Sequence, residues 1–147
     1  MHFVTGGAFN GKRAWVKQTY KGYHWISAYE NASLPIDVST IEGNLLVLEG
    51  IELWVKEFTN KYNLNECRNV WNRCLDQWQS WEKEKPGRII VIIGTDITKG
   101  IVPVEKENRR WRDAAGWAFQ DLAARAEKVD IIWYGINHTI KAGGEEE

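Results

Sequence analysis

The sequence predicts an α/β fold in which helices cover both faces of a doubly wound, mostly parallel sheet. Short apolar segments alternate along the chain with longer amphipathic ones, and this alternation is typical of parallel strands joined by right-handed helical crossovers. Two of the apolar segments, 44–49 and 89–95, are almost continuously aliphatic, as expected of strands that are covered on both faces. A glycine-rich turn directly after the first apolar segment is the third indication.

Five segments have the composition of β-strands. They are residues 2–5, 23–29, 44–49, 89–95 and 131–136, with residues 139–141 as an extension of the sheet. Segment 44–49 is rich in Leu, and the other four are rich in β-branched or aromatic residues.

Four segments have the periodicity of amphipathic helices, namely residues 12–20, 51–62, 64–83 and 105–127. The third places seven apolar residues on one stripe: Leu64, Cys67, Trp71, Cys74, Leu75, Trp78 and Trp81. Such a stripe predicts a helix packed against a core. The fourth carries interspersed acidic and basic residues, which is typical of an exposed helix. Within it we expect an Arg112–Asp113 ion pair to steady the preceding loop.

Length and charge limit the classes of protein to consider. A chain of 147 residues predicts one domain, here residues 1–141, followed by a disordered acidic tail at 142–147. A net charge of −1 gives no reason to expect binding to nucleic acid or to an anionic membrane. No apolar stretch is long enough to span a bilayer, and the N-terminus does not resemble a signal peptide. We therefore expect a cytoplasmic protein.

The cysteines and tryptophans are expected in the core. Cys67 and Cys74 lie seven residues apart in a predicted helix, so their Cα atoms would be about 10 Å apart, too far for a disulfide. Their spacing does not indicate zinc. The nine tryptophans could stack on nucleic-acid bases, but most fall at helical core spacing without basic neighbours, which favours packing.

The turn after the first strand has the pattern of a phosphate-binding loop. Residues 6–12 read Gly6-Gly7-Ala8-Phe9-Asn10-Gly11-Lys12, which matches G-x-x-x-x-G-K. Main-chain N–H groups at the start of a helix would surround a polyphosphate, and Lys12 would reach its β- and γ-phosphates. Arg13 stands where the pattern has the Ser or Thr that binds Mg²⁺. The alternatives are that the glycines serve packing alone, and that Arg13 is either a solvated helix residue or a cation directed at the γ-phosphate.

Two carboxylates follow strands at the same predicted edge of the sheet. Glu49 closes segment 44–49, and Asp96 follows segment 89–95. Ligands of doubly wound sheets bind beyond the carboxyl ends of the strands, so both are candidates to hold Mg²⁺ and to orient an acceptor hydroxyl. Each could equally cap the segment that follows it.

At this point the chain resembles a known family. Gly100-Ile101-Val102-Pro103, then Arg112-Asp113 and Gly116, together with the glycine loop, resemble the adenosylcobinamide kinase/adenosylcobinamide-phosphate guanylyltransferase family of cobalamin synthesis. The resemblance implies a RecA-like P-loop NTPase fold, often trimeric, that uses ATP or GTP with Mg²⁺ to phosphorylate cobinamide and then transfers GMP. It implies that residues 6–12 hold the nucleotide and that Glu49 and Asp96 take the positions of the family's acidic residues.

The sequence departs from this family in the region that carries the residue needed for guanylyl transfer. The family carries a guanylylated His after the second strand, whereas residues 30–35 here contain no His. The nearest, His24, lies within a predicted strand, where a packed core residue is the usual role. Phe119 stands where the family commonly has Asn. The sequence therefore predicts the kinase activity and makes guanylyl transfer doubtful. The alternatives are a catalytically degenerate nucleotide-binding sensor or partner subunit, and a bifunctional enzyme with a relocated nucleophile.

Overall fold

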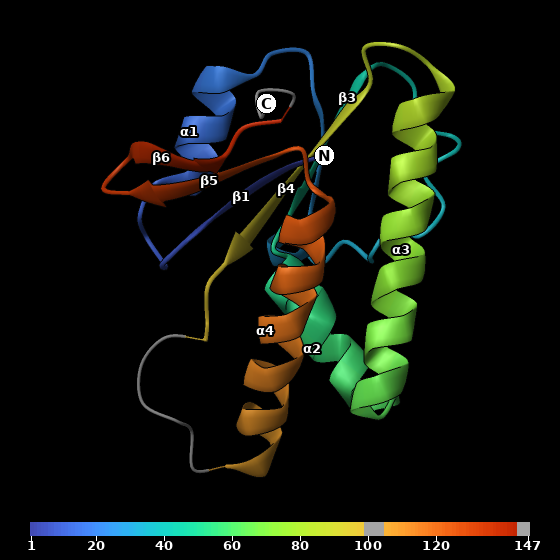
Figure 1. The fold of residues 1–147 in the computed structure, drawn as a ribbon, viewed down its shortest axis with the longest axis vertical. Helices are drawn as coiled ribbons and strands as arrows, with labels where there is room; N and C mark the ends of the chain where they lie inside the picture. Colours follow the sequence, from blue (N-terminus) through green and yellow to red (C-terminus); the bar gives the residue numbers. More distant parts are fainter. Residues whose placement is uncertain (99–104, 144–147) are drawn as a thin grey trace.

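The computed structural model describes residues 1–98 and 105–143. Its six-stranded sheet has the order β2-β3-β4-β1-β5-β6 (Figure 1). The strands are β1 (His2–Gly6), β2 (His24–Ser27), β3 (Leu45–Glu49), β4 (Ile89–Thr95), β5 (Lys128–Trp133) and β6 (Ile136–Lys141). All neighbouring pairs are parallel except β5 and β6, which are antiparallel. The predicted α/β class with a mostly parallel sheet is confirmed.

Helices cover both faces of the sheet, but unequally. They are α1 (Lys12–Thr19), α2 (Ile51–Lys61), α3 (Leu64–Glu84) and α4 (Lys106–Arg125), with a short 3-10 turn, η1 (Ala28–Glu30). Figure 1 shows α2, α3 and α4 grouped on one side of the sheet, with α1 on the other. The long α3 begins with a capping box, in which Asn63 and Glu66 exchange side-chain and main-chain hydrogen bonds. This box satisfies main-chain N–H groups that a helix start leaves unpaired.

Successive side chains of each strand point to opposite faces of the sheet, so the molecule has two separate hydrophobic cores. Phe3, Leu46 and Ile92 face the larger core under α2, α3 and α4, whereas their neighbours Val4 and Val47 face the smaller core under α1. The larger core contains four essentially buried tryptophans: Trp54, Trp71, Trp78 and Trp81. The expected packing role is confirmed for these four. Trp133, at 63% exposed, is not a core residue.

The two cysteines are free and buried, as the helical spacing predicted. Cys67 and Cys74 both face the larger core from α3. Burial raises the pKa of the Cys74 thiol to about 11, because the thiolate would lose its hydration. Cys74 is therefore a packing residue and not a nucleophile.

One strand prediction is wrong. Residues 131–136 are not a single strand, because Tyr134 and Gly135 form the turn between β5 and β6. Both turn residues have positive φ, 54° for Tyr134 and 74° for Gly135, which is the geometry of a two-residue hairpin turn. This turn is part of the surroundings of the site, because it contacts the glycine loop.

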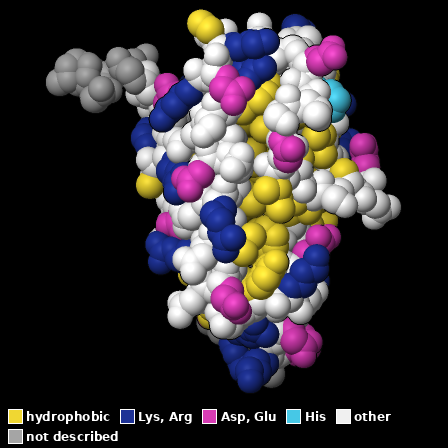
Figure 2. Space-filling view, turned by 90° about the vertical axis from the view of Figure 1, so that its right-hand side faces the viewer, with side chains coloured by type: hydrophobic (Ala, Val, Ile, Leu, Met, Phe, Trp, Pro, Cys, Tyr) yellow, Lys and Arg dark blue, Asp and Glu magenta, His cyan; other side chains and the backbone are white. Residues whose placement is uncertain are grey.

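The side of the molecule that carries α3 has a mixed surface. Figure 2 shows a band of hydrophobic side chains on it, flanked by interspersed basic and acidic ones. No helix in the described ranges, 1–98 and 105–143, is long and apolar enough to cross a membrane. Of the expected tail at 142–147, residues 144–147 lie outside the described residues, as do Gly100–Pro103. Gly143 lies against Glu127, since an added Cβ would come 2.5 Å from the Glu127 carbonyl oxygen.

Candidate functional site

The glycine loop is a tight turn between β1 and α1 whose conformation requires its glycines. Gly6 has φ 144°, and a Cβ there would lie 2.4 Å from the main-chain oxygen of Ile132, closer than any side chain allows. Gly11 caps α1 with φ 89°. The turn of the β5–β6 hairpin supports the loop from one side, because the Gly135 N–H donates to the Asn10 carbonyl at 2.8 Å. The loop is thus held before any ligand binds.

The main-chain N–H groups of this loop are available to a ligand. Among the described residues, no N–H from Ala8 to Ala14 donates a hydrogen bond. The first N–H that does so is that of Trp15, which reaches the Gly11 carbonyl at 3.0 Å. A run of free donors at the positive end of a helix dipole is suited to bind an anion.

Lys12 is a buried ammonium without a carboxylate partner. Its exposed fraction is 8%, and its Nζ donates to the Gly7 carbonyl of the same loop at 2.7 Å. Within the described residues it forms no ion pair. Burial lowers the pKa of Lys12, and the nearby charges of Glu52 and Glu49 only partly oppose this. An anion placed against the loop would compensate this buried charge.

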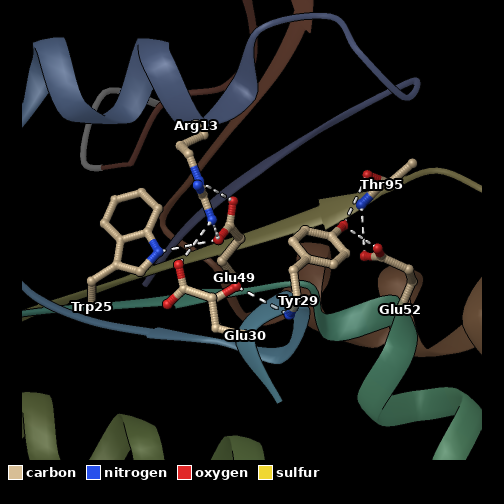
Figure 3. A network of polar contacts seen from close by, with 8 residues as sticks. Arg13, Trp25, Tyr29, Glu30, Glu49, Glu52 and Thr95 are labelled. Atoms are coloured by element: carbon tan, nitrogen blue, oxygen red, sulfur yellow. Dashed lines mark hydrogen bonds and ion pairs between the residues drawn. The ribbon is translucent and has the colours of Figure 1, made fainter. Parts of the chain in front are cut away.

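Arg13 is bound to Glu49 through two hydrogen bonds. Nε donates to Oε2 at 2.8 Å and Nη2 donates to Oε1 at 2.6 Å (Figure 3). Trp25 supports the pair, since its Nε1 donates to Glu49 at 3.1 Å and its ring lies 5.8 Å from the guanidinium carbon. Burial alone would raise the pKa of Glu49, but its hydrogen bonds, led by that from Arg13, lower it below the ordinary value. Arg13 is therefore not simply a solvated helix residue.

The sequence interpretation missed Glu52. Its carboxylate is 4% exposed, accepts from the Thr95 N–H at 2.9 Å and is hydrogen bonded to the hydroxyl of Tyr29. Burial and this carboxylate raise the pKa of Tyr29, so the phenol stays protonated. Glu52 thus joins the first turn of α2 to the end of β4 (Figure 3). The available signal was its place in the first turn of the helical segment that follows Glu49, at the positive end of the helix dipole.

Asp96 lies at the expected edge of the sheet but serves a turn. Its Oδ1 accepts from the N–H and the hydroxyl of Thr98, at 2.8 and 2.5 Å, so the capping alternative describes its contacts. The neighbouring Arg112 donates to the Thr98 carbonyl at 3.0 Å. Arg112 therefore contacts the loop after β4 directly, without the expected ion pair to Asp113.

A cavity of about 680 Å³ gathers most of the candidate residues. It is lined by Ala8, Phe9, Gly11, Lys12, Arg13, Ala14, Tyr29, Glu49, Glu52, Ile93 and Thr95. Five of the eight predicted loop residues thus share one cavity with Glu49, whereas Gly6, Gly7, Asn10 and Asp96 are not part of its lining. Lys12 and Arg13 face Glu49 and Glu52, so the lining carries two charges of each sign. A polar anion with an apolar portion would fit such a cavity.

The comparison with known families gives the same assignment as the resemblance. The family model described as cobinamide kinase / cobinamide phosphate guanyltransferase matches residues 13–140. The chain belongs to this family. The match begins at Arg13, directly after the glycine loop, so the part of the chain that it covers holds Glu49 and Asp96 but not Lys12.

One relative supports the family membership along most of the chain. The "Bifunctional adenosylcobalamin biosynthesis protein CobP" of Pseudomonas aeruginosa is 28% identical over 136 residues. The matched region spans 89% of this chain and 74% of the relative. The mostly parallel sheet with its covering helices is consistent with the α/β P-loop NTPase fold of this family.

None of the three histidines lines the cavity. His24 begins β2 and is exposed, so the expectation that it is a packed core residue is wrong. His2 is buried, with Nε2 2.6 Å from Asp130 and Nδ1 2.6 Å from the Tyr20 hydroxyl. His138 lies on the exposed strand β6.

Proposed function

We propose that this chain is a kinase that uses a nucleoside triphosphate to phosphorylate the aminopropanol hydroxyl of cobinamide or adenosylcobinamide, in cobalamin biosynthesis or salvage. The observation that carries the proposal is Lys12. Among residues 1–98 and 105–143, no carboxylate pairs with this buried ammonium and no acceptor binds the N–H groups of residues 8–14 above it, and a polyphosphate would satisfy both. The family membership supplies the acceptor.

In this proposal residues 1–141 act as one nucleotide-binding domain and residues 6–13 contact ATP or GTP. The acceptor hydroxyl oxygen attacks the γ-phosphorus and its proton passes to solvent water, while the bond to the β–γ bridging oxygen breaks and the nucleoside diphosphate leaves with the released electron pair. Lys12 and the loop N–H groups stabilise the charge that moves onto the bridging and terminal oxygens. Positioning and electrostatics supply most of the barrier reduction in such transfers. Glu49, on the cavity wall, would orient the acceptor.

The decisive experiment is a kinase assay with purified chain, cobinamide and either ATP or GTP. We expect cobinamide phosphate, identified by mass spectrometry, in equal amount to the nucleoside diphosphate formed. Nucleotide binding without any product would instead favour the second candidate, a nucleotide-binding sensor or partner subunit. The observation behind that candidate is that Arg13 already engages both oxygens of Glu49.

Glu49 and Asp96 were expected to hold Mg²⁺ and to act in catalysis, and of these two roles only the catalytic one is kept as a proposal. As the side chains lie, the oxygens of Glu49 are bound by Arg13, and Asp96 is bound by Thr98 outside the cavity lining. The donor set therefore does not fit a resident Mg²⁺, and no step above depends on one.

Two variants test the carboxylates. We expect Glu49→Gln to lower kcat/KM for cobinamide phosphorylation roughly 10- to 100-fold, because it removes a charge-assisted bond that holds Arg13. We expect Asp96→Asn to have a smaller effect, because an amide oxygen still caps the Thr98 turn. Unchanged turnover in both variants would reject a catalytic role for either residue.

A further experiment tests the doubtful second activity. We expect no protein-bound label after incubation with α-labelled GTP, because no histidine of the chain lines the cavity. The measurement is acid-labile radioactivity on the denatured chain, with γ-labelled GTP as the control for phosphorylation. Label retained only from the α-position would show that the chain is bifunctional with a relocated nucleophile.

Self-association and location are separate proposals. The trimer that the resemblance implies would require a surface to bury, and β6 is an edge strand exposed along its whole length, including Ile136 and Ile140. Analytical ultracentrifugation would test the oligomeric state. A cytoplasmic location is proposed from the soluble substrates of the reaction, and fractionation of cells would test it.

A further inference from the structure

Arg13 occupies a position that commonly serves the metal in nucleotide-binding loops. The pattern G-x-x-x-x-G-K ends in a Ser or Thr whose hydroxyl binds Mg²⁺. Here the residue is the second of α1, lines the cavity and carries a guanidinium instead of a hydroxyl. A cation of the protein therefore stands where the pattern would recruit a metal cation.

The Arg13 guanidinium is held in place by its neighbours and retains N–H donors for a ligand. Nε and Nη2 donate to Glu49, Nη2 also lies 3.7 Å from a Glu30 carboxylate oxygen, and the guanidinium carbon lies 5.8 Å from the centre of the Trp25 ring. Because Arg has five N–H donors, both hydrogens of Nη1 remain for another partner. The side chain is 43% exposed, so a ligand in the cavity can reach it. Figure 3 shows this fork between α1 and the end of β3.

The two carboxylates that line the cavity are both occupied by protein donors. Glu49 is bound by Arg13 and Trp25, and Glu52 is bound by Thr95 and Tyr29. A metal would have to displace a bidentate ion pair or separate α2 from β4. Mg²⁺ is normally held in such sites by one or two carboxylates together with the substrate phosphates. This cavity offers it no free carboxylate.

We propose that Arg13, held by Glu49, takes the place of Mg²⁺ at the phosphate loop, so that the chain binds nucleoside triphosphates without a divalent metal. Lys12 and Arg13 would flank the phosphate chain, one as a point charge and the other as a planar donor. This proposal rests on the proposed nucleotide site and adds the identity of its countercharge.

The first test compares nucleotide affinity with and without metal. Calorimetric titration of the full chain with ATP and with GTP is run in excess EDTA and again in Mg²⁺. We expect the dissociation constants measured in EDTA and in Mg²⁺ to agree within about threefold. In binding free energy, a threefold difference is less than half of a tenfold one. Binding that requires Mg²⁺ would overturn the proposal while leaving the nucleotide site intact. Absence of binding under both conditions would instead refute the nucleotide site itself.

The second test restores the hydroxyl. Arg13→Ser should bind roughly 10- to 100-fold more weakly in EDTA, the loss expected for a charge-assisted hydrogen bond, and Mg²⁺ should recover part of it. Arg68→Ser is the matched control, because Arg68 makes the same two-bond pair with Asp121 between α3 and α4. It should leave nucleotide binding unchanged. Equal affinity of Arg13→Ser and the parent chain in EDTA would overturn the proposal.

A third variant controls for the possibility that Arg13→Ser binds weakly because it folds poorly. Arg13→Lys keeps the charge but cannot hold Glu49 and a phosphate with one planar group. We expect affinity in EDTA between those of the parent and Arg13→Ser, with all three chains melting cooperatively. An affinity for Arg13→Lys equal to that of Arg13→Ser would show that charge at this position contributes nothing, and would also overturn the proposal.

Discussion

Lys12→Ala should abolish nucleotide binding and reduce cobinamide phosphorylation at least about 100-fold, the usual scale for losing a group that stabilises transition-state charge. In the parent chain, ATP or GTP at 100-fold above Kd should stabilise the fold by about 2.7 kcal/mol, or roughly 5 to 10 °C in melting temperature. The variant should show no such shift. The shift depends on Lys12, because its buried ammonium lies beneath the loop and would pair with the polyphosphate.

The variant should also be no less stable than the parent without nucleotide. Burial lowers the pKa of Lys12, so its charged form costs free energy in the folded state at neutral pH, and removing it relieves that cost. Lys17→Ala is the control, because Lys17 is exposed on the same helix. A Lys12→Ala chain that shifts as much as the parent would refute the loop assignment.

The location of the site could be predicted from sequence because it depends on topology. The glycine loop follows β1 and Glu49 ends β3, and in a parallel sheet the carboxyl ends of strands share one edge. Residues of the glycine loop and Glu49 line one cavity in the structure. Strand composition and helical periodicity were sufficient to predict this shared edge. They specify the order of strands and helices along the chain and the parallel direction of the strands, and neither depends on a particular side-chain contact.

The contacts within the site could not be predicted in the same way. Arg13 and Glu49 are 36 residues apart, and β4 lies between β3 and β1, so the two strands are separated by about 10 Å. The chain has 20 acidic residues, and only the register of three strands decides which of them a long arginine side chain reaches. The pairing of Glu52 with Thr95 depends on the same register.

The hairpin was missed for a local reason. Apolar composition runs unbroken through residues 131–136, and Tyr134-Gly135 lacks the Asn-Gly or Asp-Gly signal of a two-residue turn. Asp130 lies within β5, where it accepts from Thr139 at 2.5 Å and from Asn137 at 3.1 Å across the hairpin. These polar partners let a charged residue occupy a buried strand position that composition alone would assign to a loop.

Trp71→Ala should destabilise the fold by about 3 to 5 kcal/mol, as expected when a fully buried tryptophan leaves a cavity. Trp71 is completely buried, its ring packs edge to face on Trp78 with centroids 5.7 Å apart, and its Nε1 donates to the Ala118 carbonyl at 2.9 Å. The substitution therefore removes packing contacts between α3 and α4 together with the hydrogen bond that joins them.

Urea unfolding at neutral pH measures this loss, and Trp133→Ala is the matched control. Trp133 is 63% exposed at the end of β5, so its removal should change the unfolding free energy by less than about 1 kcal/mol. If Trp71→Ala leaves too little folded protein, Trp71→Phe keeps most of the volume and should still lose about 1 kcal/mol or more with the hydrogen bond. Equal costs for Trp71→Ala and Trp133→Ala would mean that the α3–α4 core does not hold the helices against the sheet. The strand ends that carry the site would then require another source of rigidity.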